Sequence, residues 1–245
     1  MSPGTAIDTT ILLRRDGLKG AIALVLARVS NAMRIEQKLA ASINARRSIR
    51  RYRSEPIKRQ VIERLLLAAT RAPSPHNRQP WRFAVVEGDV SKRALAQAMG
   101  ERLRADRKAD SDDITAIETD IARSHARIEG APVVIVVCID MRDMDRYPDS
   151  RRSQAEYLMA VQSAAMSAQN LLLAAQSEDL GGSIMCAPLF CPDTVIETLD
   201  LPREWMPQML LTVGMPSDAG RERPRAGLDE IVRWLPRGAI ARLDD

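Results

Sequence analysis

The strongest pattern along the chain is a set of short apolar runs separated by longer helical repeats. Residues 131–140, APVVIVVCID, form a continuous β-branched run with apolar residues at successive positions. Such a run is typical of a strand that is buried on both faces of a sheet. Residues 208–216 repeat the pattern, and residues 82–88 predict a further strand. We therefore expect a central sheet covered on both sides.

Helical spacing accounts for much of the remaining chain. Apolar positions recur every three or four residues over 17–45, which predicts one or two helices ahead of the first strand. Residues 153–182 predict a long helix that ends at a Gly–Gly pair, and its centre is small and apolar nearly all round. That composition indicates burial against several elements or another subunit. Shorter helices are expected at 54–72, 192–201 and 228–235, a polar helical segment at 89–130, and a strand or turn at 183–188.

No linker interrupts this alternation of helices and strands. It therefore predicts an α+β fold in one domain over residues 41–245, preceded by an N-terminal helical extension over residues 1–40.

Composition excludes several classes of protein. The net charge is only +4, dispersed along the chain, and aromatic residues make up 3% of it. These values argue against a nucleic-acid partner. Three cysteines without a close pair fit a reducing, cytoplasmic compartment. The apolar stretch 21–27 is too short to cross a membrane, so we expect no stable membrane insertion.

Common catalytic motifs are missing from the sequence. His76 and His125 stand apart, without ligands at metal-binding spacing, so we expect no metal site. There is no GxSxG elbow, no Walker phosphate loop and no GxGxxG turn. Either the protein is not an enzyme, or a bound cofactor supplies the reactivity.

Three segments carry candidate chemistry. RRSIR (46–50) offers several guanidinium forks and a hydroxyl within one turn, which suits a phosphate. APSPHNRQPWRF (72–83) contains three prolines, which restrict the backbone and hold polar groups at fixed angles. LGGSIMCAP (180–188) places two glycines where a backbone can approach a ligand closely.

In their order and spacing, these segments resemble the FMN-dependent nitroreductase family along residues 40–235. Residues 147–156 and 186–195 are further similar to the C-terminal FMN domain of the bifunctional deazaflavin-coenzyme γ-glutamyl ligase. The resemblance implies a nitroreductase-like fold, with a mostly antiparallel sheet surrounded by helices, in an intertwined homodimer. It also implies an oxidoreductase, a flavoprotein with FMN as cofactor and NAD(P)H as reductant. Hydride would pass through flavin N5 to a small-molecule acceptor, without a catalytic side chain.

The same resemblance assigns candidate cofactor-binding residues. Arg46, Ser48 and Arg50 match phosphate-binding positions, with Arg47 as a neighbouring candidate, and Arg223 or Arg225 would close on the phosphate. The remaining candidates would contact the flavin ring or ribityl chain; they are Pro73, Ser74, Asn77, Gly182, Cys186 and Ala187. We expect Cys186 to be a buried thiol beside the cofactor rather than a reactive one, and Trp81 to be a core anchor.

Two departures from the resemblance bear on function. The chain lacks the Glu–Gly pair of many nitroreductases, and residues 1–40 are too few to form a ligase domain. The segment 89–130 is expected to be a lid, and its arginines either bind an anionic acceptor or form a solvated helix face. The acceptor could thus be a dehydro precursor of the deazaflavin coenzyme. The alternatives are a general NAD(P)H-dependent nitro or quinone reductase, and a non-catalytic flavin-binding or storage module.

Overall fold

The computed structural model describes residues 40–235. Its centre is a four-stranded antiparallel sheet with the strand order β1-β2-β4-β3. The strands are β1 (Trp81–Val86), β2 (Val133–Asp140), β3 (Gly181–Met185) and β4 (Trp205–Gly214). Every residue of β2 is buried, which confirms the strand expected at 131–140.

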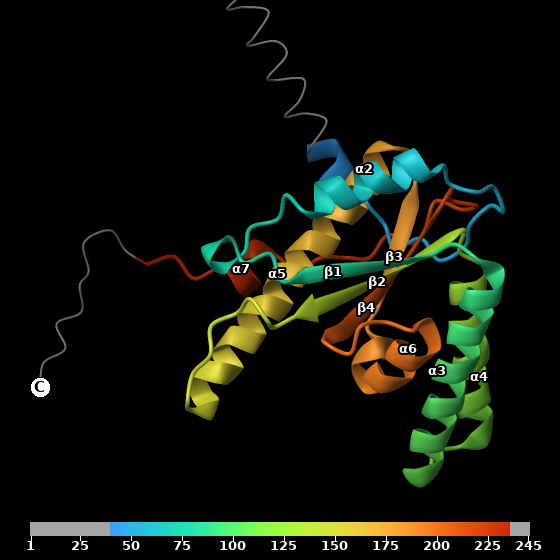
Figure 1. Ribbon diagram of the computed structural model, residues 1–245. Coiled ribbons are helices and arrows are strands. Elements are labelled where there is room, and N and C mark those ends of the chain that lie inside the picture. Colours follow the sequence, from blue (N-terminus) through green and yellow to red (C-terminus); the bar gives the residue numbers. More distant parts are fainter. Residues whose placement is uncertain (1–39, 236–245) are drawn as a thin grey trace, which may run out of the picture.

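Helices cover both faces of this sheet (Figure 1). On one face lie α2 (Arg59–Ala69) and α5 (Ser150–Ser177), and the core there includes Ile135 and Leu171. On the other lie α3 (Asp89–Ala109), α4 (Ile114–Glu129) and α6 (Pro192–Leu199). This arrangement confirms the α+β expectation of a mostly antiparallel sheet surrounded by helices.

The long helix α5 runs diagonally across one face of the sheet. Its small residues Ala160, Ala164 and Ala168 are fully buried in the core of the same chain, because small side chains let the helix approach the strands closely. Among residues 40–235, α5 is the helix long and apolar enough to cross a membrane, and this packing explains its apolar side. The side facing away from the sheet carries the exposed Leu158 and Met166.

Some boundaries differ from the sequence expectations. The Gly181–Gly182 pair lies inside β3 instead of ending the long helix, which stops at Ser177. The segment 89–130 is a hairpin of two helices. The closing helix is only one turn, α7 (Leu228–Ile231), after which Val232 is extended. Two short 3-10 helices, η1 (Pro75–Asn77) and η2 (Ala187–Phe190), follow α2 and β3.

The expected N-terminal extension falls almost wholly outside the described residues. Only its end is seen, where residues 40–45 are helical. The boundary at residue 40 therefore stays a prediction.

Candidate functional site

The RRSIR segment is an extended strip attached to one edge of the sheet. Ser48 forms a parallel bridge with Gly182, and the Ile49 N–H donates to the Gly182 carbonyl oxygen at 3.0 Å. Ile49 is buried, with 5% of its surface exposed, so it anchors the strip in the core. The polar residues on either side of Ile49 are thereby held at the surface.

These residues line a cavity of about 720 Å³, which we call the first basic cavity. It carries six arginines and a single carboxylate. The lining residues are Ile43, Asn44, Arg46, Arg47, Ser48, Arg50, Gln169, Arg221, Glu222, Arg223 and Arg225. A concentration of guanidinium groups with little neutralisation is suited to a dianionic phosphate. The structure thus brings together the six candidates that the resemblance offered for a phosphate, including both Arg223 and Arg225.

One of these arginines already has partners within the chain. The Arg47 guanidinium lies 3.0 Å from the Glu222 carboxylate and donates to the backbone oxygen of Arg46 at 3.2 Å. Arg47 therefore ties the strip to residues 221–225, which come from the far end of the chain. By contrast, Arg46, Arg223 and Arg225 have no carboxylate within 4.0 Å in the part of the chain that the structure describes.

Gly220 brings residues 221–225 against the strip. Its φ of +68° is a left-handed conformation that favours glycine. A β-carbon there would lie 2.8 Å from Ile49 Cδ1 and 3.0 Å from Arg47 Cβ. The close contact at Gly220 is thus what closes the first basic cavity.

Sequence reasoning missed Gln169 and Arg221 in this cavity. Arg221 belongs to the same basic segment, RERPR, as the two arginines that were predicted, so composition could have identified it. Gln169 lies on the outward side of α5. Nothing in a helix that is apolar nearly all round would have identified one glutamine as a cavity residue.

The proline-rich loop does not line the first basic cavity. Three of its residues have left-handed backbones: His76 (φ 47°), Asn77 (φ 55°) and Gln79 (φ 49°). The Ser74 hydroxyl accepts from the Gln79 N–H at 3.0 Å and so helps to hold this shape. Pro73 and Asn77 are exposed, and η1 packs near α5. Trp81 is 5% exposed, so its expected role as a core anchor is confirmed.

The third segment, 180–188, packs tightly against the core at its glycines. A β-carbon on Gly182 would lie 2.6 Å from Leu172 Cδ2 and 3.0 Å from the Thr212 oxygen. The glycine is thus needed for packing inside the chain, and its expected approach to a ligand stays a prediction. Ala187 lines a small cavity of about 80 Å³ beneath α3 and α4.

The three cysteines differ in exposure. Cys186 is exposed in the single chain, and its expected burial beside the cofactor stays a prediction. Cys138 and Cys191 are buried. Burial raises the pKa of the Cys138 thiol to about 12 and also raises the pKa of Cys191.

Several arginines of the α3–α4 hairpin, the expected lid, are paired within the hairpin and are not free to bind an acceptor. Arg102, Arg104 and Arg107 all pair with carboxylates of the hairpin itself, at 2.9 Å or less. For these three, the solvated helix face is the better interpretation. Arg152 likewise pairs with Asp149 and lies over the Tyr147 ring.

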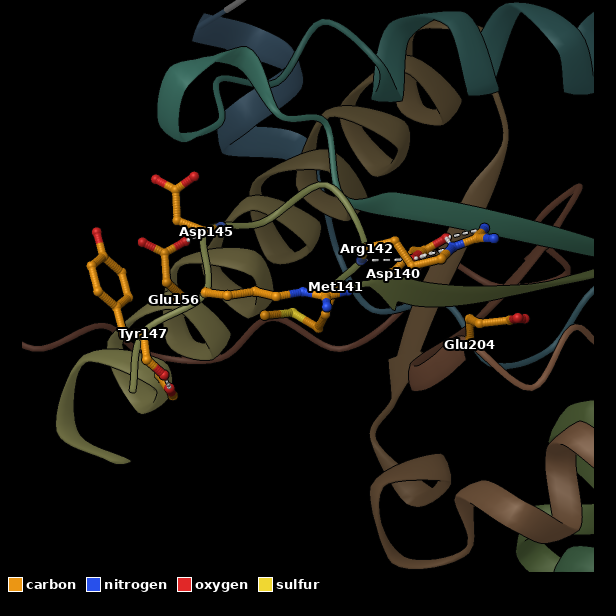
Figure 2. Close-up of a pocket in the computed structure, with 9 residues that line it drawn as sticks. Asp140, Met141, Arg142, Asp145, Tyr147, Glu156 and Glu204 are labelled. Atoms are coloured by element: carbon orange, nitrogen blue, oxygen red, sulfur yellow. Dashed lines mark hydrogen bonds and ion pairs between the residues drawn. The ribbon is translucent and has the colours of Figure 1, made fainter. Parts of the chain in front are cut away.

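A further cavity of about 470 Å³ lies beyond the end of β2 (Figure 2). Four carboxylates and two arginines line it; they are Asp140, Asp145, Glu156, Glu204, Arg142 and Arg146. The buried Asp140 accepts from Arg142 Nη2 at 2.6 Å, and this hydrogen bond holds the pKa of Asp140 below its usual range. The excess of negative charge makes this cavity unsuited to a phosphate.

The chain is similar to several known proteins over most of its length. The Nitroreductase family model matches residues 43–215. An NADH dehydrogenase of Thermus thermophilus is 31% identical over 213 residues, which cover 77% of this chain and 92% of the relative. A 5,6-dimethylbenzimidazole synthase of Rhodospirillum rubrum is 30% identical over 203 residues, with 79% and 87% covered.

Solved structures show the same similarity. A candidate nitroreductase from Desulfovibrio desulfuricans, solved in complex with FMN, is 26% identical and has a TM-score of 0.61. The match covers 81% of this chain and 96% of that one. With the family model and the relative from Thermus thermophilus, it leads to one conclusion: the chain belongs to the nitroreductase family.

Proposed function

We propose that the protein is an FMN-dependent oxidoreductase that takes its electrons from NAD(P)H. The observation that carries this proposal is the first basic cavity, where the RRSIR strip and residues 221–225 surround about 720 Å³ with six arginines and one carboxylate. When bound, FMN supplies hydride transfer between the nicotinamide and an acceptor at its N5 position.

The chain's own residues would bind and orient the cofactor. Arg46, Arg223 and Arg225 would neutralise the phosphate dianion with charge-assisted hydrogen bonds, and the Ser48 hydroxyl adds a further donor. Arg47 is held by Glu222, so it would act mainly by positioning residues 221–225. The sheet edge holds the backbone of the strip, and Gly220 brings residues 221–225 against it, so these two segments are already in place before the cofactor binds.

A second copy of the chain would complete the site. The loop 72–80 and the first basic cavity share no lining residue, although the resemblance assigns both to one flavin. Gln169 lines the cavity from the outward side of α5, which also carries the exposed Leu158 and Met166. This arrangement supports a homodimer in which α5 lies at the interface and the loop of one subunit reaches the flavin of its partner. The small residues of α5, expected at that interface, are instead buried within the chain.

The acceptor is a small molecule whose class is open to direct test. A dehydro precursor of the deazaflavin coenzyme stays a prediction that depends on the resemblance to the ligase domain alone. A general NAD(P)H-dependent nitro or quinone reductase is supported by the relative from Thermus thermophilus, an NADH dehydrogenase. Arg102, Arg104 and Arg107 are each paired with a carboxylate of the α3–α4 hairpin, and this weakens the argument that these three arginines bind an anionic acceptor.

The first experiment is the absorption spectrum of the freshly purified protein, with mass spectrometry of what heat releases. We expect a yellow protein that releases FMN. Arg46→Gln and Arg225→Gln should each weaken FMN binding about tenfold or more, since each removes a charged donor. Arg59→Gln is the matched control, because Arg59 is an exposed arginine on α2 outside the cavity. A colourless protein that takes up no added FMN would refute the proposal.

Turnover then separates the enzyme from a storage protein. Anaerobic addition of NADH or NADPH should bleach the bound flavin, and an acceptor should restore its colour. Steady turnover of nitrofurazone or menadione would favour the general reductase. Flavin that neither nicotinamide reduces would support the non-catalytic alternative instead.

A further inference from the structure

A second basic cavity lies between the RRSIR strip and the end of α4. It has a volume of about 520 Å³ and is lined by Arg50, Arg51, Tyr52, Arg123, Ala126, Arg127 and Gly130. Four of these residues are arginines, and none is a carboxylate. The two basic cavities share one residue, Arg50.

The positive charge here is only partly neutralised. Arg51 lies 3.8 Å from the Asp218 carboxylate, and Arg123 lies 3.1 Å from Asp120. Asp120 is itself shared, because Arg107 Nη1 approaches it at 2.7 Å. Within residues 40–235, no carboxylate lies within 4.0 Å of the Arg50 or Arg127 guanidinium. This lack of partners contrasts with Arg102 and Arg104, which are fully paired on the same hairpin.

The arginines of the second basic cavity lie close enough for their positive charges to repel one another. Burial lowers the pKa of the half-buried Arg127, and the nearby positive charges of Arg50 and Arg123 lower it further. The end of α4 offers some compensation, since the carbonyl end of a helix favours cations. That partial charge, with the Asp218 and Asp120 carboxylates, offsets only part of the charge of the four guanidinium groups, so a bound anion would relieve the remaining repulsion.

Tyr52 gives this cavity a firm wall. Its hydroxyl donates to the Ile49 oxygen at 2.6 Å and lies 2.8 Å from Thr212 Oγ1. Tyr52 also pairs with Pro216 through a backbone bridge. The ring is therefore fixed beside the arginines, and the site needs no rearrangement of the strip to receive a ligand.

We propose that the second basic cavity is a binding site for a small phosphorylated ligand, distinct from the flavin phosphate. Guanidinium groups from two elements, the strip and α4, converge on it, which suits the oxygens of a phosphate monoester or diphosphate. The volume is larger than a single inorganic phosphate needs, so the ligand carries a further group such as a sugar or nucleoside. Because Arg50 lines both cavities, occupation of one should alter affinity at the other.

The test is calorimetric titration of inorganic pyrophosphate into the full chain in 150 mM salt, with FMN saturating so that the first basic cavity is filled. We expect saturable binding that Arg127→Gln and Arg123→Gln each weaken about tenfold or more. Arg93→Gln is the matched control: it removes the same charge from an exposed position of the hairpin that lines neither basic cavity. FMN absorbance should be the same in the unmodified protein and in the three variants.

The outcomes are distinguishable from those of the proposed function. Absence of saturable pyrophosphate binding, or equal weakening by Arg93→Gln and Arg127→Gln, would overturn the second site, whether or not the protein is yellow. Binding that depends on Arg127 supports it even in a colourless protein. In that case, competition identifies the source of the phosphate. Displacement of pyrophosphate by NADP⁺ would identify a dinucleotide. Displacement by ribose 5-phosphate but not by NADP⁺ would identify a free sugar phosphate.

Discussion

At the scale of single residues, the role of each arginine depends on whether a carboxylate lies within reach. Arg104 and Arg107 face Glu118 and Asp120 across the α3–α4 hairpin and are neutralised there. Arg46 and Arg127 have no such partner among the described residues. Exposed pairs contribute little to stability, so the functional difference between these arginines is their availability to a ligand.

The cysteines provide a prediction at the same scale. The thiolate is the reactive form, and a pKa of about 12 keeps Cys138 protonated at neutral pH as well as shielded. We expect a thiol reagent such as DTNB to modify Cys186 rapidly in the native protein, and Cys138 only after unfolding. If Cys186 lies beside the flavin, bound FMN should slow its modification.

Cys186→Ala is the control for that measurement. It should remove the fast phase and leave the slow one. A fast phase that survives this substitution would show that another thiol is accessible, which the burial of Cys138 and Cys191 does not allow.

At the scale of elements, the first basic cavity depends on contact between two segments that are far apart in the sequence. The strip 46–50 is fixed to the edge of β3, and residues 221–225 meet it through the turn at Gly220 and the Arg47–Glu222 ion pair. The loop 72–80 uses three left-handed backbones to leave α2 and enter β1. These irregular connections position the candidate site, while the sheet supplies a rigid support for them.

Gly220→Ala should therefore affect both stability and cofactor binding. An alanine at φ +68° costs about 1–2 kcal/mol, and its β-carbon would also press on Ile49 Cδ1. We expect a lower midpoint of thermal unfolding and weaker FMN binding, measured by calorimetry and fluorescence. Gly88→Ala is the control for FMN binding, because its φ is −74° and its β-carbon would meet only Ser91 Oγ, at 3.9 Å; Gly88 caps α3, so this substitution should lower stability slightly but leave FMN binding unchanged. Equal effects of the two substitutions would contradict the assigned role of Gly220.

At the scale of the whole molecule, one chain leaves several large apolar side chains exposed. The exposed apolar residues include Leu158 and Met166 on α5, Phe190 after β3, and Trp234 and Leu235 near the end of the described chain. Leu158 and Met166, about two turns apart on one helix, are the part of this set that suits an interaction surface. The homodimer of the proposed function would cover these two side chains.

Light scattering coupled to size exclusion should give a mass near twice the 27.2 kDa of one chain. Met166→Glu should shift the protein toward the monomer and reduce its FMN content together, because a charge would be buried at the interface next to the site. Leu67→Glu, at an exposed apolar position on α2, should change neither. A monomer that retains FMN would contradict the shared site.

What could be predicted from the sequence alone was mainly local. Hydrophobic periodicity identified β2, β4 and α5, since burial on both faces leaves a continuous apolar run. The RRSIR segment was recognised as suited to a phosphate because it offers several guanidinium forks and a hydroxyl within one turn, and only the family resemblance added Arg223 or Arg225 to it. Helix ends were less accurate: α7 is one turn, and the Gly–Gly pair belongs to a strand.

Only the tertiary structure decided which groups meet and which remain free. It placed Gln169 in the first basic cavity, assigned Gly182 to packing, exposed Cys186, and joined Arg50 and Arg51 to Arg123 and Arg127 from α4. Sequence spacing could not reveal these facts, because each depends on contacts between segments separated by tens of residues. Periodicity records which side of an element is buried, whereas the partner of a charge is determined by the packing of the whole chain.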